Sequence, residues 1–257
     1  MDIDETLART QWDTFWLPRD ARRIERSEIL YLASSRNEGY VNAVLRLDAG
    51  DARLPALAEE VDAAHEGVAS RWMLSRGNRR AVVERAITAR GYAPEHEMHA
   101  YAIGVTAHRP RAAPSVDVRD VATLDDLRTW VRVSSRAFDR VVDEDEARLR
   151  EQLAFCTGPN ARVQRVVAWD RERNEPVGAA GLTMFPALRF GLLWAGGVVR
   201  EARGRGAYSA MVAARVAHAR TRGIGAVGLY ARVDTSAPNV ARQGFEKHGP
   251  MTYWMRR

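Results

Sequence analysis

Blocks of apolar residues alternate with amphipathic segments along the second half of the chain, and this pattern predicts strands and helices in a regular order. Continuous apolar runs predict strands over 163–169, 177–184, 189–199 and 226–232. Apolar positions three or four residues apart predict helices over 125–138, 143–155, 207–222 and 238–243. Short strands are predicted over 115–118 and 251–255. We therefore predict a mixed α/β fold with the order β-α-α-β-β-β-α-β-α-β.

The first half repeats the later part of this order in a shorter form. Its pattern predicts strands over 40–47, 71–74 and 96–103 and helices over 54–66 and 79–90. Both halves close their last helix with a glycine followed by an aromatic residue, at Gly91 and Gly244. A Pro-rich polar segment over 109–114 predicts a linker. We interpret the chain as a duplication, with domains over 1–110 and 111–257; coincidence between two α/β patterns is the alternative.

A turn rich in glycine and arginine joins the strand over 189–199 to the helix over 207–222. The turn reads Arg203-Gly204-Arg205-Gly206-Ala207-Tyr208. Glycine lets the backbone curl tightly, and the free N–H groups at a helix start attract anions. No lysine follows the glycines, as a P-loop needs, and the spacing does not match a dinucleotide fingerprint. The turn predicts a site for a phosphate-bearing ligand; a Gly-rich turn without a ligand is the alternative.

This turn resembles the pyrophosphate loop of the GNAT superfamily of N-acetyltransferases, Arg/Gln-x-x-Gly-x-Gly/Ala. Arg203 and Gly206 match its first two fixed positions, whereas Tyr208 stands where the family has Gly or Ala. The order of elements over 113–257 is similar to the full GNAT fold. The resemblance implies a tandem GNAT fold, acyl-CoA N-acyltransferase-like, with a complete C-terminal copy. In the first half the loop is replaced by Ala49-Gly50-Asp51-Ala52, where a carboxylate repels phosphate, so we expect a degenerate copy that does not bind CoA.

The resemblance also implies which residues hold acetyl-CoA. Backbone groups of the strand over 189–199 would bind the pantetheine, where this strand splays from the strand over 226–232. N–H groups of the loop would bind the pyrophosphate, and one N–H near Val198 would polarise the thioester carbonyl. The residues implied to bind acetyl-CoA are Gly197, Val198, Val199, Arg203, Gly204, Arg205, Gly206, Ala207, Tyr208 and Asn239.

The general acid and base are less well defined by this resemblance. GNAT enzymes often use a tyrosine of the last helix to protonate the leaving thiolate, and Val240 stands at that position here. The candidate replacements are Tyr208, Tyr230 and Ser236. Asp234 is either a base or an ordinary turn residue. Trp194, on the strand just before the polarising N–H, is the candidate for lining the substrate pocket.

Composition and charge exclude several classes of protein. The net charge of +6 comes from arginines scattered among acids rather than from basic runs, which argues against nucleic-acid binding. Cys156 is the only cysteine, and the one close pair of histidines, His96 and His99, falls on opposite faces of a predicted strand, so no metal site is expected. No apolar run reaches the ~20 residues of a membrane span. The acidic N-terminus lacks a signal pattern, which predicts a cytoplasmic protein, as a monomer or homodimer.

These observations predict a GNAT acyltransferase that moves an acetyl or other acyl group from acetyl-CoA to an amine of a small molecule or peptide. The alternative is a non-catalytic acyl-CoA-binding protein on the same scaffold, because the expected tyrosine and a clear base are missing. The identity of the acceptor, the acyl chain and the oligomeric state cannot be read from the sequence, because acceptor pockets of this fold carry no general code.

Overall fold

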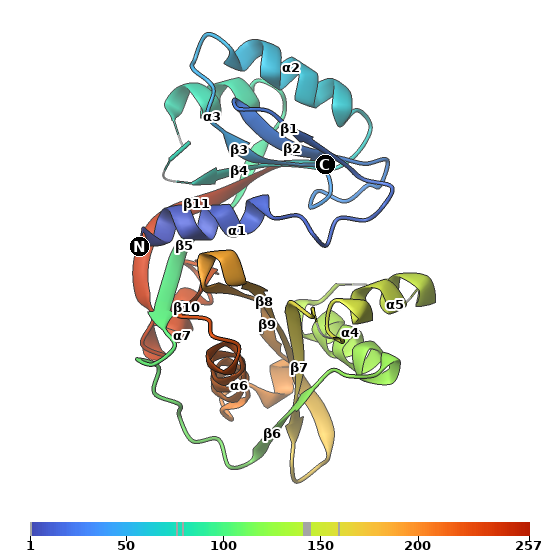
Figure 1. Cartoon of the computed structure of the whole chain (residues 1–257), viewed down its shortest axis with the longest axis vertical. Helices are drawn as coiled ribbons and strands as arrows, with labels where there is room; N and C mark the ends of the chain where they lie inside the picture. The colour runs from blue at the N-terminus through green and yellow to red at the C-terminus, as the bar shows by residue number, and fades with distance from the viewer. Residues whose placement is uncertain (1, 76, 79, 141–144, 159) are drawn as a thin grey trace. The chain divides into compact units, whose positions relative to one another are not determined.

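The computed structural model describes residues 2–75, 77–78, 80–140, 145–158 and 160–257, which form a mixed α/β structure (Figure 1). The chain divides into two compact units that are interleaved in sequence. Unit 1 takes the segment up to Tyr101 together with Tyr230–Asn239 and Lys247–Arg257. Unit 2 takes Ala102–Leu229 and Val240–Glu246. The duplication over 1–110 and 111–257 stays a prediction, since compactness alone does not test common ancestry.

Unit 1 is built on strands with helices on both faces. The strand order is β1 (Arg22–Glu25), β2 (Ile29–Ala33), β3 (Ala43–Leu47), β4 (Ser70–Ser75), β11 (Glu246–Arg256) and β5 (Ala93–Gly104). Figure 1 shows α2 (Leu54–Ala64) and α3 (Ala81–Thr88) on one side of β2–β4 and α1 (Ile3–Trp12) on the other. Two apolar clusters fill the space between these layers. The pattern along the first half did not predict α1, β1 or β2.

The C-terminal strand β11 is part of unit 1 rather than of unit 2. It pairs antiparallel with β4, from Met251 opposite Ser75 to Arg256 opposite Ser70. Trp254 lies opposite Trp72 and joins the larger apolar cluster of this unit. The observed strand is longer than the predicted one over 251–255, because its first residues are polar and exposed and carry no apolar signal. The last residues of the chain therefore complete the sheet of the first unit.

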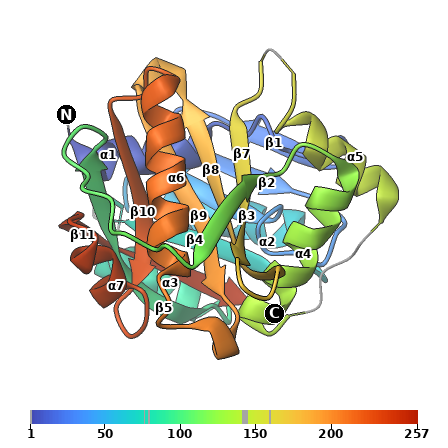
Figure 2. The same ribbon diagram turned by 90° about the horizontal axis from the view of Figure 1, so that it is seen from below.

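Unit 2 has the strand order β10 (Ala226–Arg232), β9 (Phe190–Val198), β8 (Glu175–Phe185), β7 (Val163–Asp170) and β6 (Val116–Asp120). Figure 1 shows α4 (Leu124–Phe138) and α5 (Glu146–Ala154) on one face of β7–β9 and α6 (Ala207–Thr221) on the other. Figure 2 shows α6 lying along the strands it covers. The short helix α7 (Ala237–Arg242) follows β10, and both elements contribute residues to each unit.

Local signals explain why these elements form where the pattern predicts them. Thr123 and Asp126 make a reciprocal capping box that starts α4. Asp145 accepts a hydrogen bond from the Arg148 N–H at the start of α5; the first two residues of the predicted helix over 143–155 lie outside the described residues. Gly223, at a positive φ of 71°, follows the end of α6. The predicted strands and helices of this half are confirmed within a few residues of their expected bounds.

Replacing Trp254 by alanine tests whether β11 holds unit 1 together. The buried indole leaves a cavity between β11 and β4, so we expect unfolding to become easier by about 3–5 kcal/mol. Hydrogen exchange should become faster at the amides of β2–β4 and change little in α6. Lys247→Ala, at an exposed position of the same strand, is the control. Equal protection of β4 in the two variants would contradict the assignment of β11 to this core.

Candidate functional site

The turn before α6 exposes a run of backbone N–H groups. Gly204 and Gly206 have φ values of 79° and 87°, a left-handed conformation that glycine adopts without a steric penalty. Gly206 is the N-cap of α6, and no side chain caps the helix. In the described part of the chain, no protein acceptor takes the N–H groups from Gly204 to Ser209. They lie at the positive end of the helix dipole, where an anion is stabilised.

Arginine side chains surround this turn. The Nε atom of Arg203 donates to the carbonyl of Val198 at 3.1 Å, which ties the turn to the end of β9. Arg205 is half-exposed and lies 3.5 Å from the carboxylate of Asp170. Arg200 is exposed as well. The turn thus combines free N–H donors with positive side chains, as a phosphate group requires.

One edge of β9 lacks a strand partner over most of its length. Within the described residues, β9 pairs with β10 only where Phe190–Leu192 meets Ala226–Gly228. The other edge of β9 stays paired with β8 as far as Val198. The strands separate after Leu192, as expected, which frees the outer backbone groups of Gly197 and its neighbours. Val199 differs from the expectation, because its N–H donates to Val177 and its carbonyl accepts from Ala202.

A β-bulge interrupts β9 where its outer edge is unpaired. Gly181 of β8 faces Trp194, and Ala179 faces Gly197, so two residues of β9 oppose a single residue of β8. Ala195 in this bulge has a φ of 48°, a strained value for a residue with a side chain. The bulge redirects the backbone N–H groups near Gly196. The consecutive glycines Gly196 and Gly197 within an apolar strand are the sequence signal for this bulge.

Side chains from both helical layers hold the bulge in place. Trp130 of α4 donates its indole N–H to the carbonyl of Ala180 at 3.0 Å. Arg215 of α6 donates from Nη1 to the carbonyl of Gly181 at 2.9 Å. Trp194 itself donates to the Thr183 hydroxyl at 3.0 Å. These bonds fix both strands at the strained residue, as a pre-organised site requires.

Comparison with known proteins identifies this arrangement. A sequence model of the Acetyltransferase (GNAT) family matches residues 124–249, which span the free N–H groups, the open strand edge and the bulge. Residues 124–249 form a GNAT domain. No curated protein matches the chain.

Solved structures of GNAT proteins share this fold over the whole chain. A GCN5-related N-acetyltransferase from Kribbella flavida has a TM-score of 0.70 and 15% identity, with 99% of this chain and 95% of that chain covered. One from Sphaerobacter thermophilus has a TM-score of 0.64 and 17% identity, covering 98% and 84%. A tandem GNAT protein from the clavulanic acid biosynthesis pathway has a TM-score of 0.61 and 10% identity, covering 100% and 87%. The fold of this chain is the tandem GNAT fold.

The structure places the candidate GNAT acid and base residues in different environments. Tyr208 lies on α6 against the bulge, and its ring comes within 3.1 Å of where a Cβ on Gly196 would stand. Burial raises the pKa of Tyr208, and the nearby Arg215 opposes this effect. The phenol is therefore protonated at neutral pH and is suited to act as an acid. Among the three candidates for the acid, Tyr208 is the one that unit 2 brings to the bulge.

The other candidates belong to unit 1. Burial raises the pKa of Tyr230, and its hydroxyl has no partner in the described structure, where it packs in a methionine-rich cluster. The Ser236 hydroxyl accepts from the Arg232 N–H at 2.9 Å. Asp234 forms an ion pair with Arg232 at 2.6 Å, and a hydrogen bond from this guanidinium lowers the pKa of Asp234. Asn239 lies exposed on α7.

Trp194 packs into the layer between the sheet and α4. Its ring meets that of Trp130 edge-on, at 5.7 Å and 67°. The guanidinium of Arg165 stacks on both rings, at 5.2 and 5.4 Å from their centres. Trp194 is half-buried in this cluster, and its role in a substrate pocket stays a prediction.

The matching loop of unit 1 lacks the features of the GNAT phosphate site. Asp51 forms an ion pair with Arg80 at 2.9 Å, and Arg80 also donates to the carbonyl of Ala49. The N–H groups of Arg53 and Leu54 donate to carbonyls within the turn, and a proline follows in the first turn of α2. The turn thus carries a carboxylate, and Gly50, unlike Gly204 and Gly206, does not have a positive φ. These contacts support the proposal of a degenerate N-terminal copy.

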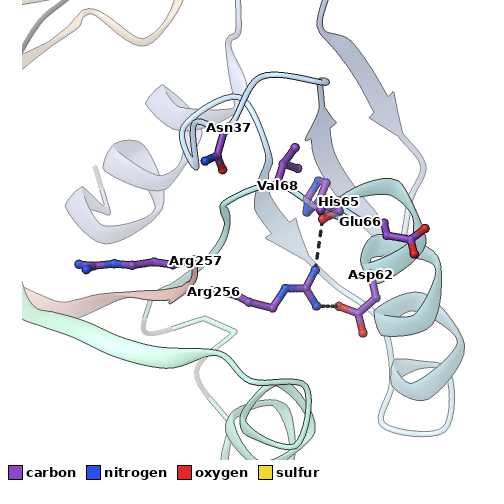
Figure 3. A pocket seen from close by; sticks show the side chains of 8 residues that line it. Asn37, Asp62, His65, Glu66, Val68, Arg256 and Arg257 are labelled. Atoms are coloured by element: carbon purple, nitrogen blue, oxygen red, sulfur yellow. Dashed lines mark hydrogen bonds and ion pairs between the residues drawn. The ribbon is translucent and has the colours of Figure 1, made fainter.

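Unit 1 also contains a hollow of about 400 Å³ between α2 and the end of β11 (Figure 3). Arg256 donates to Asp62 at 2.7 Å and to the carbonyl of His65 at 3.5 Å. Both ring nitrogens of the buried His65 are bonded, to Ser70 and to the Leu32 carbonyl. Burial lowers the pKa of His65 and favours its neutral form. The ion pair of Arg256 with Asp62 and the bonded His65 thus tie β11 to α2 within the unit.

Two wider searches of the described residues are negative. No group of three or more His, Cys, Asp or Glu side chains is placed to hold a metal ion there. None of the helices that the structure describes has the length and apolar character to cross a bilayer.

Adding a methyl group at Gly181 tests whether close packing holds the bulge. A Cβ there would stand 2.4 Å from ring atoms of Trp194, so Gly181→Ala must displace the indole. We expect a loss of about 1–3 kcal/mol in the free energy of unfolding, measured by chemical denaturation. Gly50→Ala is the control, because no atom lies within 4 Å of its Cβ position. Equal stability of the two variants would show that the bulge can rearrange freely.

Proposed function

We propose that unit 2 transfers an acetyl group from acetyl-CoA to an amine of a small molecule or peptide. The observation that carries this proposal is the run of N–H groups from Gly204 to Ser209 that no protein group accepts. These donors follow directly on a strand with one open edge and a strained bulge. Along the chain, the bulge, the open edge and the loop suit a thioester carbonyl, pantetheine amides and pyrophosphate, in that order.

Each part of the site has a role in this reaction. The loop residues Arg203 to Tyr208 hold the pyrophosphate, and the open edge of β9 near Gly197 binds the pantetheine. An N–H of the bulge polarises the thioester carbonyl, where negative charge develops during attack. The amine nitrogen attacks the carbonyl carbon and gives up one proton to water, while the carbon–sulfur bond breaks and its electron pair stays on sulfur. Tyr208, held at the bulge as a phenol, is the proposed donor of a proton to this thiolate.

A non-catalytic acyl-CoA-binding protein is the second candidate. It is favoured by Val240 at the position of the usual tyrosine and by the pairing of Asp234 with Arg232. A group that is already paired and exposed is a poor base, since its pKa is held low. Turnover of any amine distinguishes the two candidates.

Isothermal titration with acetyl-CoA tests the site. Arg203→Glu and Gly206→Asp each place a carboxylate where the pyrophosphate would bind, so we expect affinity to fall at least about tenfold. The matched controls are Arg53→Glu and Gly50→Asp in the corresponding loop of unit 1, which should bind like the wild type. Equal binding by all four variants would remove the loop from the site. A screen of amines, with release of free CoA measured, then separates enzyme from binding protein.

A further inference from the structure

Arg215 of α6 is a buried cation without an acidic partner. It is 1% exposed, and its Nε and Nη1 atoms donate to the carbonyls of Met211 and Gly181, both at 2.9 Å. No carboxylate in the described part of the chain forms an ion pair or hydrogen bond with it. A full positive charge inside a protein is unfavourable unless an opposite charge neutralises it. Bridging two carbonyls does not need a charge, since a neutral donor also does this.

The remaining nitrogen of Arg215 points toward the bulge. Nη2 lies 3.6 Å from where a Cβ on Gly196 would stand, and the Tyr208 ring lies 3.1 Å from the same point. Among the residues that the structure describes, neither Nη2 nor the Tyr208 hydroxyl makes a hydrogen bond. One cation and one phenol therefore meet at the residue where β9 is bulged and unpaired.

The charge of Arg215 persists under ordinary conditions. Burial lowers the pKa of its guanidinium to about 10, which leaves it protonated at neutral pH. The pKa of Tyr208 is raised, so this neighbour stays an uncharged phenol and does not neutralise it. Tyr208 is the one titratable group whose charge interaction with Arg215 is resolved. Arg165, the other buried arginine of unit 2, stacks on Trp130 and Trp194 in the α4 layer.

We infer that Arg215 stabilises the thiolate of CoA at the bulge, as the fixed positive charge of the site. This inference rests on the proposed function. When the amine attacks and the carbon–sulfur bond breaks, the electron pair remains on sulfur beside the guanidinium. The same charge favours the thiolate when free CoA is bound, so the bound thiol loses its proton more readily than in water. If Arg215 served only to hold the carbonyl of Gly181 in place, binding would not make the thiol of CoA lose its proton more readily.

Proton release on binding tests the inference without turnover. The protein is titrated calorimetrically with CoA and with desulfo-CoA, which lacks the thiol, each in two buffers of different ionisation enthalpy near pH 7.5. A free thiol with a pKa of about 8.5 is mostly protonated at this pH. We expect CoA to release a substantial fraction of a proton from the wild type and desulfo-CoA to release none.

Three variants separate the charge from the packing. Arg215→Met, similar in length but neutral, should lose the proton release and bind CoA about tenfold more weakly at pH 7.5, which corresponds to a change of about two pKa units in the bound thiol. Its affinity for desulfo-CoA should stay within about twofold of the wild type. Arg215→Lys keeps the charge and should restore most of the proton release. Arg220→Met, at an exposed position of α6, removes the same charge from the protein and should behave like the wild type.

Each alternative result has a definite meaning. Equal proton release by Arg215→Met and the wild type, with intact binding, overturns the role of Arg215 and leaves the proposed function standing. Binding of CoA to the wild type without proton release overturns it too, whether or not any variant folds. Binding of neither ligand to the wild type contradicts the proposed function and this inference with it.

Discussion

The site in unit 2 depends on two backbone carbonyls of β8 that need hydrogen-bond donors from outside the sheet. A bulge in β9 sets two residues against Ala180, and the carbonyls of Ala180 and Gly181 each accept a side-chain donor from a different helical layer. Buried backbone groups must find partners, so a strand that departs from its ladder needs donors from outside the sheet. Trp130 and Arg215 provide them from α4 and α6. The strained Ala195 is therefore held by the packing of both helices, and the unpaired edge of β9 follows from the same departure.

The two units contain the same strand, turn and helix in the same order, but their turns differ. In unit 2 the strand-to-helix turn has glycines at positive φ and leaves its N–H groups free. In unit 1 the corresponding turn has no glycine at positive φ, and its Asp51 forms an ion pair with Arg80. The two turns differ in glycine conformation and local charge rather than in fold, since strand, turn and helix are present in both.

Local features of this protein were predictable from sequence, and contacts between distant residues were not. The loop at Gly204 and Gly206, the helix α6 and the strands β7–β10 each carry their signal within a short window, as glycine placement or apolar periodicity. The donors to the bulge come from residues 34 and 50 positions away from the carbonyls they serve. Nothing in the periodicity of α6 marks Arg215 as buried, because a charged residue is expected on the solvent side. The strand β2 is buried along its whole length, and so lacks the alternation that identifies a half-exposed strand.

The place of β11 in unit 1 has a consequence for biosynthesis. The ribosome releases β4 long before it makes the residues that pair with its open edge, because all of Ala102–Leu229 lies between them. Until then Trp72 and Leu74 sit on a strand with an unsatisfied edge, which is the kind of surface that chaperones bind and that aggregates form on. Most residues of unit 2 are synthesised, and can fold, before the last strand of unit 1 has been made. Vectorial synthesis therefore reverses the order in which the two units reach their final structure, and the half made first is finished last.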